Sequence, residues 1–306
     1  MRRFRRKLTL LLVCLLGAAD GLATGVALVL QTDFGTKDGA VAAMKGVAVG
    51  VSPRLMIHDL SHENTPFDIW EAAYRLKQTA SYWPAGTVFV SVVDPGVGSA
   101  RKSIVLRTGS GHLFVGPDNG TWTLVAEDLG VAEVREIDTV QHLRAGSANS
   151  YTFHGRDLYV LVGAKLAAGQ LTLAEVGPPL LGGVVRLPHE KARLANGVLL
   201  GGIPALDVRY GNVWTDIGES LLAELAPVPG ERLRVRIDRG EATIYEGEMP
   251  YARTFADVPE GEPLLYLNSL MNVSFALNMD NFAARHDIAS GADWRVRGSK
   301  NTSVRS

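Results

Sequence analysis

Four segments of the chain combine polar side chains whose types and spacing could support chemistry. In residues 32–35, Asp33 directly follows an apolar run, where a carboxylate can accept hydrogen bonds from a sugar diol, as acidic residues do in dinucleotide-binding folds. Residues 94–101 form a loop with one proline and two glycines. Such a tight loop brings the carboxylate of Asp94 close to the guanidinium of Arg101.

The third and fourth segments lie later in the chain. Residues 152–157 place His154 beside a glycine and before an expected helix, so one side of the imidazole has room for a ligand. Residues 207–214 combine Asp207 and Asn212 with two aromatic residues, and aromatic faces stack on purines while an amide can pair with an amine edge. Taken singly, each segment also fits a turn, a surface ion pair or a packed histidine.

Four aspartates follow the expected strands of the first half of the chain, namely Asp33, Asp59, Asp94 and Asp118. In an open α/β sheet, the carboxyl ends of the strands border the ligand crevice. Aspartate also favours turns and helix caps, which accounts for some of these positions. If the four carboxylates met at one point they could bind a divalent cation, so a metal-dependent hydrolase is one alternative.

Other patterns exclude common enzyme classes. The chain has no G-x-G-x-x-G and no P-loop, so a phosphate cradle is not expected, and no G-x-S-x-G of an ordinary serine hydrolase. Residues 58–63 (HDLSHE) resemble a metal site in composition, but their spacing differs from H-E-x-x-H. We therefore expect no bound metal and no other cofactor.

The apolar pattern predicts a mainly parallel α/β sheet that positions the first three segments. Helices are expected to begin near Asp38 and Asp68, which can cap them, and to end at Pro53 and Pro84. The expected strands are apolar on both faces, which is typical of a sheet covered by helices on both sides. They lie at residues 26–31, 55–57, 87–93 and 113–115.

The second part of the chain is expected to be a smaller, β-rich domain. Around residues 176–196 the chain is rich in Gly, Pro and Leu without clean periodicity, which suits a linker. We place an N-terminal domain at residues 25–185, a linker at 186–195 and a C-terminal domain at 196–306. Short apolar runs broken by turns predict the strands of the last domain, at residues 197–206, 233–237, 241–245, 263–267 and 272–277.

Residues 1–24 have the pattern of a cleavable secretory signal peptide. A basic head is followed by an apolar stretch of about a dozen residues, too short for the roughly 20 that span a bilayer as a helix, and then by small residues. The single cysteine, Cys14, lies in this segment, so a cleaved chain suits an oxidising compartment. We expect a periplasmic or secreted protein with no stable membrane span after cleavage; a retained anchor or a buried first helix is the alternative.

The amino-acid composition limits the class of protein and the kinds of binding partner. With 46% hydrophobic and 21% charged residues among 306, the chain has the balance of a globular protein. Its formal net charge of −1 provides no overall basic field for nucleic acid.

Together the four segments resemble the S-adenosyl-L-methionine hydrolases, also called hydroxide adenosyltransferases, which are relatives of the fluorinating and chlorinating enzymes. The resemblance runs from about Val26 to Trp294. Its individual motifs are weak, but their order and spacing are specific. They are TDFG at 32–35, MKG at 44–46, DLSHENTP at 59–66, DPGVG at 94–98 with Arg101, PDNG at 117–120, TFHGRD at 152–157, GN at 211–212 and NS at 268–269.

The resemblance implies a homotrimer whose sites lie between the N-terminal domain of one subunit and the C-terminal domain of its neighbour. It also implies that Asp94, Arg101 and His154 act together on water. The adenosine contacts of the family carry over to Asp33, for the ribose diol, and to six further residues. These are Phe67, Asp207, Tyr210, Asn212, Trp214 and Ser269.

The chain departs from relatives at several positions. The fluorinating enzymes carry Tyr in place of the acid and the histidine, and Ser where this chain has Gly155, so a fluoride site is disfavoured. Tyr210 replaces the usual Phe and preserves stacking, whereas Met271 and Asp280 stand where Gly is common. The departures at Met271 and Asp280 are expected to alter the contacts that the C-terminal domain makes with adenine.

The resulting hypothesis is hydrolysis of S-adenosyl-L-methionine to adenosine and methionine, by attack of water or hydroxide at the adenosyl C5′. Either Asp94 or His154 could act as the base. A nucleoside-binding protein without catalysis is the second alternative beside the metal-dependent hydrolase. Export conflicts with a substrate that is made in the cytoplasm, so another adenosyl compound is also possible as substrate.

Overall fold

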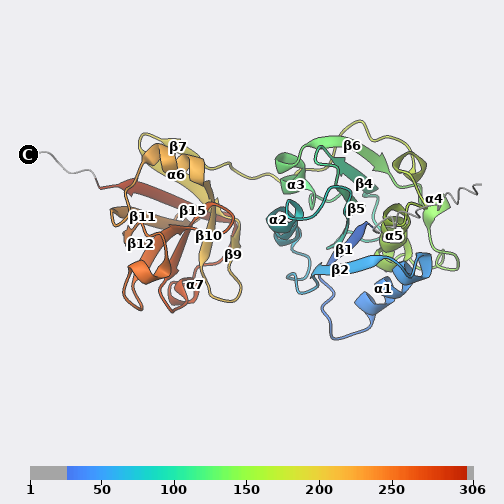
Figure 1. The fold of residues 1–306 in the computed structure, drawn as a ribbon, viewed down its shortest axis with the longest axis horizontal. Coiled ribbons are helices and arrows are strands. Elements are labelled where there is room, and N and C mark those ends of the chain that lie inside the picture. Colours follow the sequence, from blue (N-terminus) through green and yellow to red (C-terminus); the bar gives the residue numbers. More distant parts are fainter. Residues whose placement is uncertain (1–25, 302–306) are drawn as a thin grey trace, which may run out of the picture.

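The computed structural model describes residues 26–301, which form an N-terminal and a C-terminal unit joined by an extended linker (Figure 1). The N-terminal unit contains a six-stranded sheet in the order β2-β1-β3-β5-β4-β6. The first four strands in this order run parallel, whereas β4 is antiparallel to both of its neighbours. The strands are β1 (Ala27–Thr32), β2 (Met56–Ser61), β3 (Val88–Val92), β4 (Ser103–Thr108), β5 (Leu113–Pro117) and β6 (Val131–Glu136).

Helices cover both faces of this sheet. Met44 and Ala48 of α1 and Val160 of α5 share one core with Leu28 and Leu30 of β1. Helices α2 and α3 pack in a second core on the opposite face, together with Val29 and Phe89. The mainly parallel, helix-covered sheet predicted from the apolar runs is therefore confirmed. The helices and helical turns are α1 (Ala40–Val51), α2 (Ile69–Ala80), α3 (Thr123–Asp128), α4 (Thr139–His142), η1 (Gly155–Tyr159), α5 (Val160–Ala167) and η2 (Leu173–Val176).

The C-terminal unit is β-rich, as predicted, and consists of two antiparallel sheets around one apolar core. The five-stranded sheet has the order β12-β11-β15-β8-β7 and the four-stranded sheet the order β13-β14-β10-β9. Their strands are β7 (Arg193–Ala195), β8 (Val198–Ile203), β9 (Ala205–Leu206), β10 (Val213–Gly218), β11 (Arg232–Arg239), β12 (Ala242–Pro250), β13 (Pro263–Leu267), β14 (Asn272–Leu277) and β15 (Gly291–Lys300). Its helical segments are α6 (Glu219–Leu225), η3 (Phe255–Asp257) and α7 (Phe282–Arg285).

Helix α2 carries the contact between the two units within one chain. The indole Nε1 of Trp70 donates to the carbonyl of Pro204 at 3.1 Å, and Arg75 donates to the carbonyl of Leu206 at 3.4 Å. Tyr74 packs in a small apolar cluster that includes Trp214. The linker is bonded to the N-terminal unit as well, because the N–H of Val185 donates to Asp118 and the N–H of Leu187 donates to the hydroxyl of Thr123, both at 2.8 Å.

The structure corrects one prediction about the sheet and adds two strands that were not predicted. Asp59 was expected just after a strand, but β2 pairs with β1 as far as Ser61, so Asp59 lies inside the strand. The antiparallel strands β4 and β6 were not predicted. The assignment of residues 1–24 to a signal peptide lies outside the described residues.

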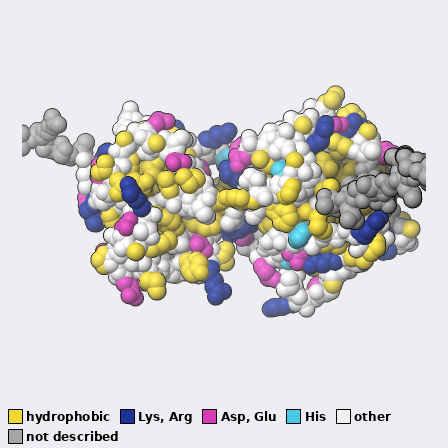
Figure 2. Space-filling view, in the orientation of Figure 1, with side chains coloured by type: hydrophobic (Ala, Val, Ile, Leu, Met, Phe, Trp, Pro, Cys, Tyr) yellow, Lys and Arg dark blue, Asp and Glu magenta, His cyan; other side chains and the backbone are white. Residues whose placement is uncertain are grey.

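The surface and the helices add two further facts. Basic and acidic side chains are interspersed on the face of both units that Figure 2 shows, and no single basic patch dominates it. No helix among residues 26–301 has both the length and the apolar character needed to cross a membrane.

The packing of α5 on the sheet depends on Gly163. A Cβ added there would lie 2.5 Å from a methyl group of Val90 and 3.4 Å from Leu28. We expect Gly163→Ala to lower the free energy of unfolding by about 1–3 kcal/mol, because the core must shift to admit the methyl group. Denaturant unfolding followed by circular dichroism measures this effect.

Gly46 of α1 provides the matched control, because a Cβ there would have no neighbour within 4 Å. Gly46→Ala is expected to raise the free energy of unfolding by up to about 1 kcal/mol through helix propensity. The close approach of α5 would be contradicted if both substitutions changed stability in the same direction.

Candidate active site

Asp94 and Arg101 form a nearly buried ion pair at the carboxyl end of β3. The Nε–H of Arg101 donates to Oδ1 of Asp94 at 2.7 Å, and a second guanidinium N–H donates to Oδ2. The Asp94 side chain is 4% exposed and that of Arg101 is 11% exposed. The backbone N–H of Gly96 also donates to Asp94, so the loop itself fixes the carboxylate. The structure thus brings together the two charged ends of the loop, as their spacing suggested.

Tyr159 provides a third anchor for the guanidinium, which the sequence alone did not single out. Arg101 Nη1 donates to the Tyr159 hydroxyl at 2.8 Å, and that hydroxyl lies 2.9 Å from Oγ of Ser103. Burial raises the pKa of Tyr159 to about 12, although the charge of Arg101 opposes this rise. The phenol is therefore neutral at physiological pH and accepts a hydrogen bond from Arg101. The only sequence signal was its position five residues after His154.

His154 lies beside this pair, directly before the π-helical turn η1. Its ring meets the ring of Tyr159 edge-on, with 6.2 Å between centroids. Its Nδ1 atom is buried and has no hydrogen-bond partner among residues 26–301. Burial lowers the pKa of His154 and the nearby charge of Arg101 lowers it further, while Asp94 and Asp157 oppose the shift. A neutral imidazole with a free nitrogen therefore borders the Asp94–Arg101 pair.

The turn that carries His154 is held by Asp157. This buried carboxylate accepts hydrogen bonds from Arg144 at 2.7 Å and from Arg156 at 2.8 and 2.6 Å. Burial acts to raise the pKa of Asp157, but the hydrogen bonds from the two arginines outweigh it, so the pKa is lowered. π-Helical turns are rare and often occur at functional sites, which fits this position.

Asp33 lies at the carboxyl end of β1, next to the same group. Its Oδ2 accepts the backbone N–H of Phe67 at 2.9 Å, and Phe34 meets Phe153 edge-on at 5.7 Å between centroids. Phe67 has a φ of 68° and its residue is 69% exposed. A strained backbone with an exposed aromatic ring is unusual in a folded protein and points to a ligand or a neighbouring chain at this position.

The remaining adenosine candidates lie in two turns of the C-terminal unit. Asp207 accepts the side-chain amide of Asn212 at 3.2 Å, while Tyr210 is 66% exposed. Ser269 is exposed in the turn between β13 and β14. In the same turn, Nδ2 of the buried Asn268 has no partner among the described residues. Asn268 was not among the predicted contacts.

The surroundings of three further side chains differ, namely those of Trp214, Met271 and Asp280. Trp214 is half-buried against Tyr74 at the contact between the two units, with 6.5 Å between ring centroids. Met271 has a φ of 59° and is 47% exposed, and Asp280 pairs with Arg285. Among residues 26–301, no hydrogen bond joins Trp214 or Asp280 to Asp207 or Asn212, so their expected part in adenine binding stays a prediction.

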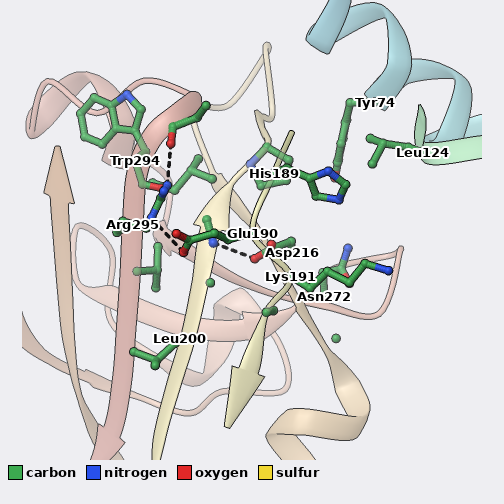
Figure 3. A pocket seen from close by; sticks show the side chains of 18 of the residues that line it. Tyr74, Leu124, His189, Glu190, Lys191, Leu200, Asp216, Asn272, Trp294 and Arg295 are labelled. Atoms are coloured by element: carbon green, nitrogen blue, oxygen red, sulfur yellow. Dashed lines mark hydrogen bonds and ion pairs between the residues drawn. The ribbon is translucent and has the colours of Figure 1, made fainter. Parts of the chain in front are cut away.

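Two cavities lie between the units of one chain. A cavity of about 830 Å³ is bordered by Thr65 and Asp68 on one side and by Asp207 and Gly211 on the other. A larger cavity of about 1000 Å³ is bordered by Tyr74, His189 and Asp216, among others (Figure 3). The larger cavity is lined by none of the predicted catalytic residues.

The four strand-end aspartates do not form one cluster. Asp33 binds Phe67, Asp59 binds Lys45 and His62, and Asp94 binds Arg101, while Asp118 accepts the N–H of Val185 in the linker at 2.8 Å. Across residues 26–301, no group of three or more His, Cys, Asp and Glu side chains is arranged to hold a metal ion. The metal-dependent alternative thus has no ligand set in this part of the chain.

Comparison with known proteins places these residues in a family. The chain is 35% identical over 266 residues to an (R)-S-adenosyl-L-methionine hydrolase from Salinispora arenicola, which covers 87% of this chain and 95% of the relative. It is also 31% identical over 286 residues to a fluorinase from Actinoplanes sp., covering 85% and 94%. The crystal structure of an uncharacterized conserved protein from Thermotoga maritima superimposes with a TM-score of 0.82 at 34% identity, covering 89% of this chain and 100% of that one.

Family descriptions match both units. Residues 28–177 match the SAM hydroxide adenosyltransferase N-terminal domain, and residues 201–295 match the C-terminal domain of the same family. These two stretches contain every catalytic and adenosine-contact residue predicted from the sequence. The chain belongs to the SAM hydroxide adenosyltransferase family.

Proposed function

We propose that the protein hydrolyses S-adenosyl-L-methionine to adenosine and L-methionine, an activity that the names of several relatives give for those proteins. The observation that carries this proposal is the nearly buried Asp94–Arg101 pair with the imidazole of His154 near it. Such a group can bind one water molecule and orient it toward an electrophilic carbon.

The chemistry requires little beyond a positioned nucleophile. An oxygen–C5′ bond forms while the C5′–sulfur bond breaks, and its electron pair goes to the sulfonium sulfur, which leaves as neutral methionine. Arg101 stabilises the negative charge that the water oxygen gains as its proton is removed. Both oxygens of Asp94 already accept hydrogen bonds from Arg101, so we assign the imidazole of His154 as the acceptor for the proton of water.

The identity of residue 155 favours water over halide as the nucleophile. The fluorinating enzymes are expected to carry a serine there, whereas this chain has Gly155, which has no hydroxyl group to bind a halide. We therefore propose hydrolysis rather than halogenation, although fluorinases are among the relatives.

We further propose a homotrimer in which adenosine binds between subunits. Asp33 and Phe67 would bind the ribose and the base on one side, with Asp207, Tyr210, Asn212, Trp214 and Ser269 on the other. The exposure of the rings of Phe67 and Tyr210, 69% and 66%, supports a partner surface at each. The proposed reaction uses no metal ion and no other cofactor.

Export of the protein is a separate proposal that rests on the pattern of residues 1–24. A periplasmic or secreted enzyme would act on adenosyl compounds outside the cytoplasm. Cell fractionation followed by N-terminal sequencing of the protein tests this proposal.

His154→Ala is expected to lower kcat for S-adenosyl-L-methionine hydrolysis by about 100-fold or more, because it removes the proton acceptor beside the ion pair. The dissociation constant for adenosine should change by less than about threefold. Chromatographic detection of adenosine gives kcat, and calorimetry gives the binding constant. His58→Ala, at an exposed site on β2, is the control and should retain full activity.

Three results would lead to different functions. Adenosine binding without turnover by the wild-type protein would indicate a nucleoside-binding protein. Activity lost with a chelator and restored by Mg²⁺ or Mn²⁺ would indicate a metal-dependent hydrolase. A halogenated nucleoside formed in the presence of fluoride or chloride would indicate a halogenase.

The pH dependence of kcat/KM should follow the neutral form of His154. Its pKa lies below the ordinary value of 6.5, because burial and Arg101 disfavour the imidazolium. Protonation at low pH would occupy the lone pair of the imidazole, so kcat/KM should rise with pH, reach half its maximum below pH 6.5 and then level off. His154→Asn, which does not titrate, should lose this acidic limb, and a midpoint above 6.5 would contradict the assignment.

Subunit mixing tests the site between subunits. His154→Ala disables the N-terminal half of the site, and Tyr210→Ala weakens base stacking in the C-terminal half by about 1–3 kcal/mol. Random mixed trimers should recover about a quarter of wild-type activity at low substrate, since one site in four combines two intact halves. Mixed trimers without recovery, or a monomer by light scattering, would overturn the shared site.

A further inference from the structure

A continuous line of hydrogen bonds lies behind Asp33, in the segment whose composition resembled a metal site. The Thr32 hydroxyl lies 2.8 Å from Nδ1 of His62, and Nε2 of His62 lies 3.0 Å from Oδ1 of Asp59. The other oxygen of Asp59 accepts from Nζ of Lys45 at 2.6 Å. The four side chains come from β1, β2, α1 and the residue following β2, so the network joins three elements of the N-terminal unit.

The partners of His62 determine the direction of each bond. A carboxylate only accepts, so Nε2 of His62 donates to Asp59, and in the neutral tautomer with this N–H the lone pair lies on Nδ1. In that tautomer the Thr32 hydroxyl donates to Nδ1, and its oxygen accepts the backbone N–H of Phe34 at 3.2 Å. Partial burial acts to raise the pKa of Asp59, but the bonds from Lys45 and His62 outweigh it and lower the pKa, so the carboxylate is ionised.

This line of bonds resembles a nucleophilic triad, but its hydroxyl cannot act as a nucleophile. Thr32 is completely buried and its oxygen already takes part in two hydrogen bonds. His62 is only 4% exposed. No substrate can therefore reach the hydroxyl, and the network holds structure instead.

The structure that it holds is the turn bearing Asp33. The carbonyl of Thr32 accepts from Nδ2 of Asn64 at 3.0 Å, and the N–H of Gly35 donates to the carbonyl of His62 at 2.7 Å. The backbone on both sides of Asp33 is thus bonded to residues 62–64. Asp33 uses one carboxylate oxygen for the N–H of Phe67, and no bond to its other oxygen is recorded within residues 26–301.

We infer that Thr32 and His62, supported by Asp59 and Lys45, are positioning residues that orient the Asp33 carboxylate toward the ribose diol of the bound nucleoside. This inference rests on the proposed function, because it assumes a nucleoside at Asp33. The inner Thr32–His62 bond is buried, whereas the side chains of Lys45 and Asp59 are 38% and 42% exposed. Solvent screens the outer ion pair, so the inner bond carries most of the effect.

The test compares two ligands that differ only in the diol. Calorimetry measures the binding of adenosine and of 2′,3′-dideoxyadenosine to the full chain and to Thr32→Val and Thr32→Ser. Thr32→Val keeps the shape of the side chain but removes the hydroxyl, so adenosine should bind about tenfold more weakly. Binding of the dideoxy compound should stay within about twofold, and Thr32→Ser should restore adenosine binding.

Steady-state kinetics supplies a second readout. Thr32→Val should raise KM for S-adenosyl-L-methionine about tenfold while kcat changes by less than about threefold, because binding of the ribose is affected and the attacking water is not. Asp59→Asn should have a much smaller effect, since it weakens only the exposed outer pair.

The outcomes separate this inference from the proposed function. Unchanged adenosine binding in Thr32→Val, or equal weakening of both ligands, would overturn the positioning role even if the wild-type protein is active. If the wild-type protein neither binds adenosine nor hydrolyses S-adenosyl-L-methionine, the proposed function fails and the inference fails with it.

A second pair of variants covers the case in which Thr32→Val does not fold, which thermal melting reveals. His62→Asn places an amide oxygen where Nδ1 stood and can keep the bond to Thr32, whereas His62→Leu cannot. Selective loss of adenosine binding in His62→Leu alone supports the inference. Equal behaviour of the two variants toward both ligands overturns it.

Discussion

The nearly buried ion pair between Asp94 and Arg101 is the interaction on which the site depends. Removing two charges from water is costly, and their attraction compensates only when the geometry is good and the remaining donors are satisfied. Here the pair is bidentate, Gly96 adds a backbone N–H, and the Tyr159 hydroxyl, itself bonded to Ser103, accepts the third arm of the guanidinium. A buried ion pair is by itself weak evidence for a contribution to folding stability. The additional hydrogen bonds around this pair fix its geometry, as expected for side chains that must hold a reacting molecule in place.

The parallel sheet brings these groups to one edge. Asp33 follows β1 and Asp94 follows β3, which are adjacent and parallel, so their carboxyl ends meet. His154 reaches the same edge from the turn before α5, and the contact between Phe34 and Phe153 joins that turn to the first loop. Behind this layer, the buried bond between Thr32 and His62 fixes the backbone that bears Asp33. Catalytic and binding groups thus rest on elements whose own positions are set by packing.

Several features could be predicted from the sequence because they depend on local chemistry. Strands apolar on both faces predicted a covered, mainly parallel sheet, and Asp68 caps α2 by accepting the N–H of Glu71 at 2.9 Å. Asp59 and Asp118 show where this reasoning fails. The position of Asp59 was wrong because β2 continues to Ser61. Asp118 follows β5 as predicted, but its carboxylate accepts the linker N–H of Val185, 67 residues away, and does not join the other aspartates. Strand length and distant partners depend on pairing across the sheet, which a local pattern does not contain.

The amino-acid sequence by itself determined the residue types, their order and the tight loop that joins Asp94 to Arg101, because a short segment with proline and glycine restricts its own backbone. Only the tertiary structure decided which groups meet across long stretches of chain. It brought Tyr159 to Arg101, left Nδ1 of His154 without a partner among the described residues, and turned an apparent metal motif into a line of hydrogen bonds behind Asp33. The physical reason is that burial and hydrogen-bond direction arise from packing between elements, whereas spacing along the chain specifies only what neighbours can do.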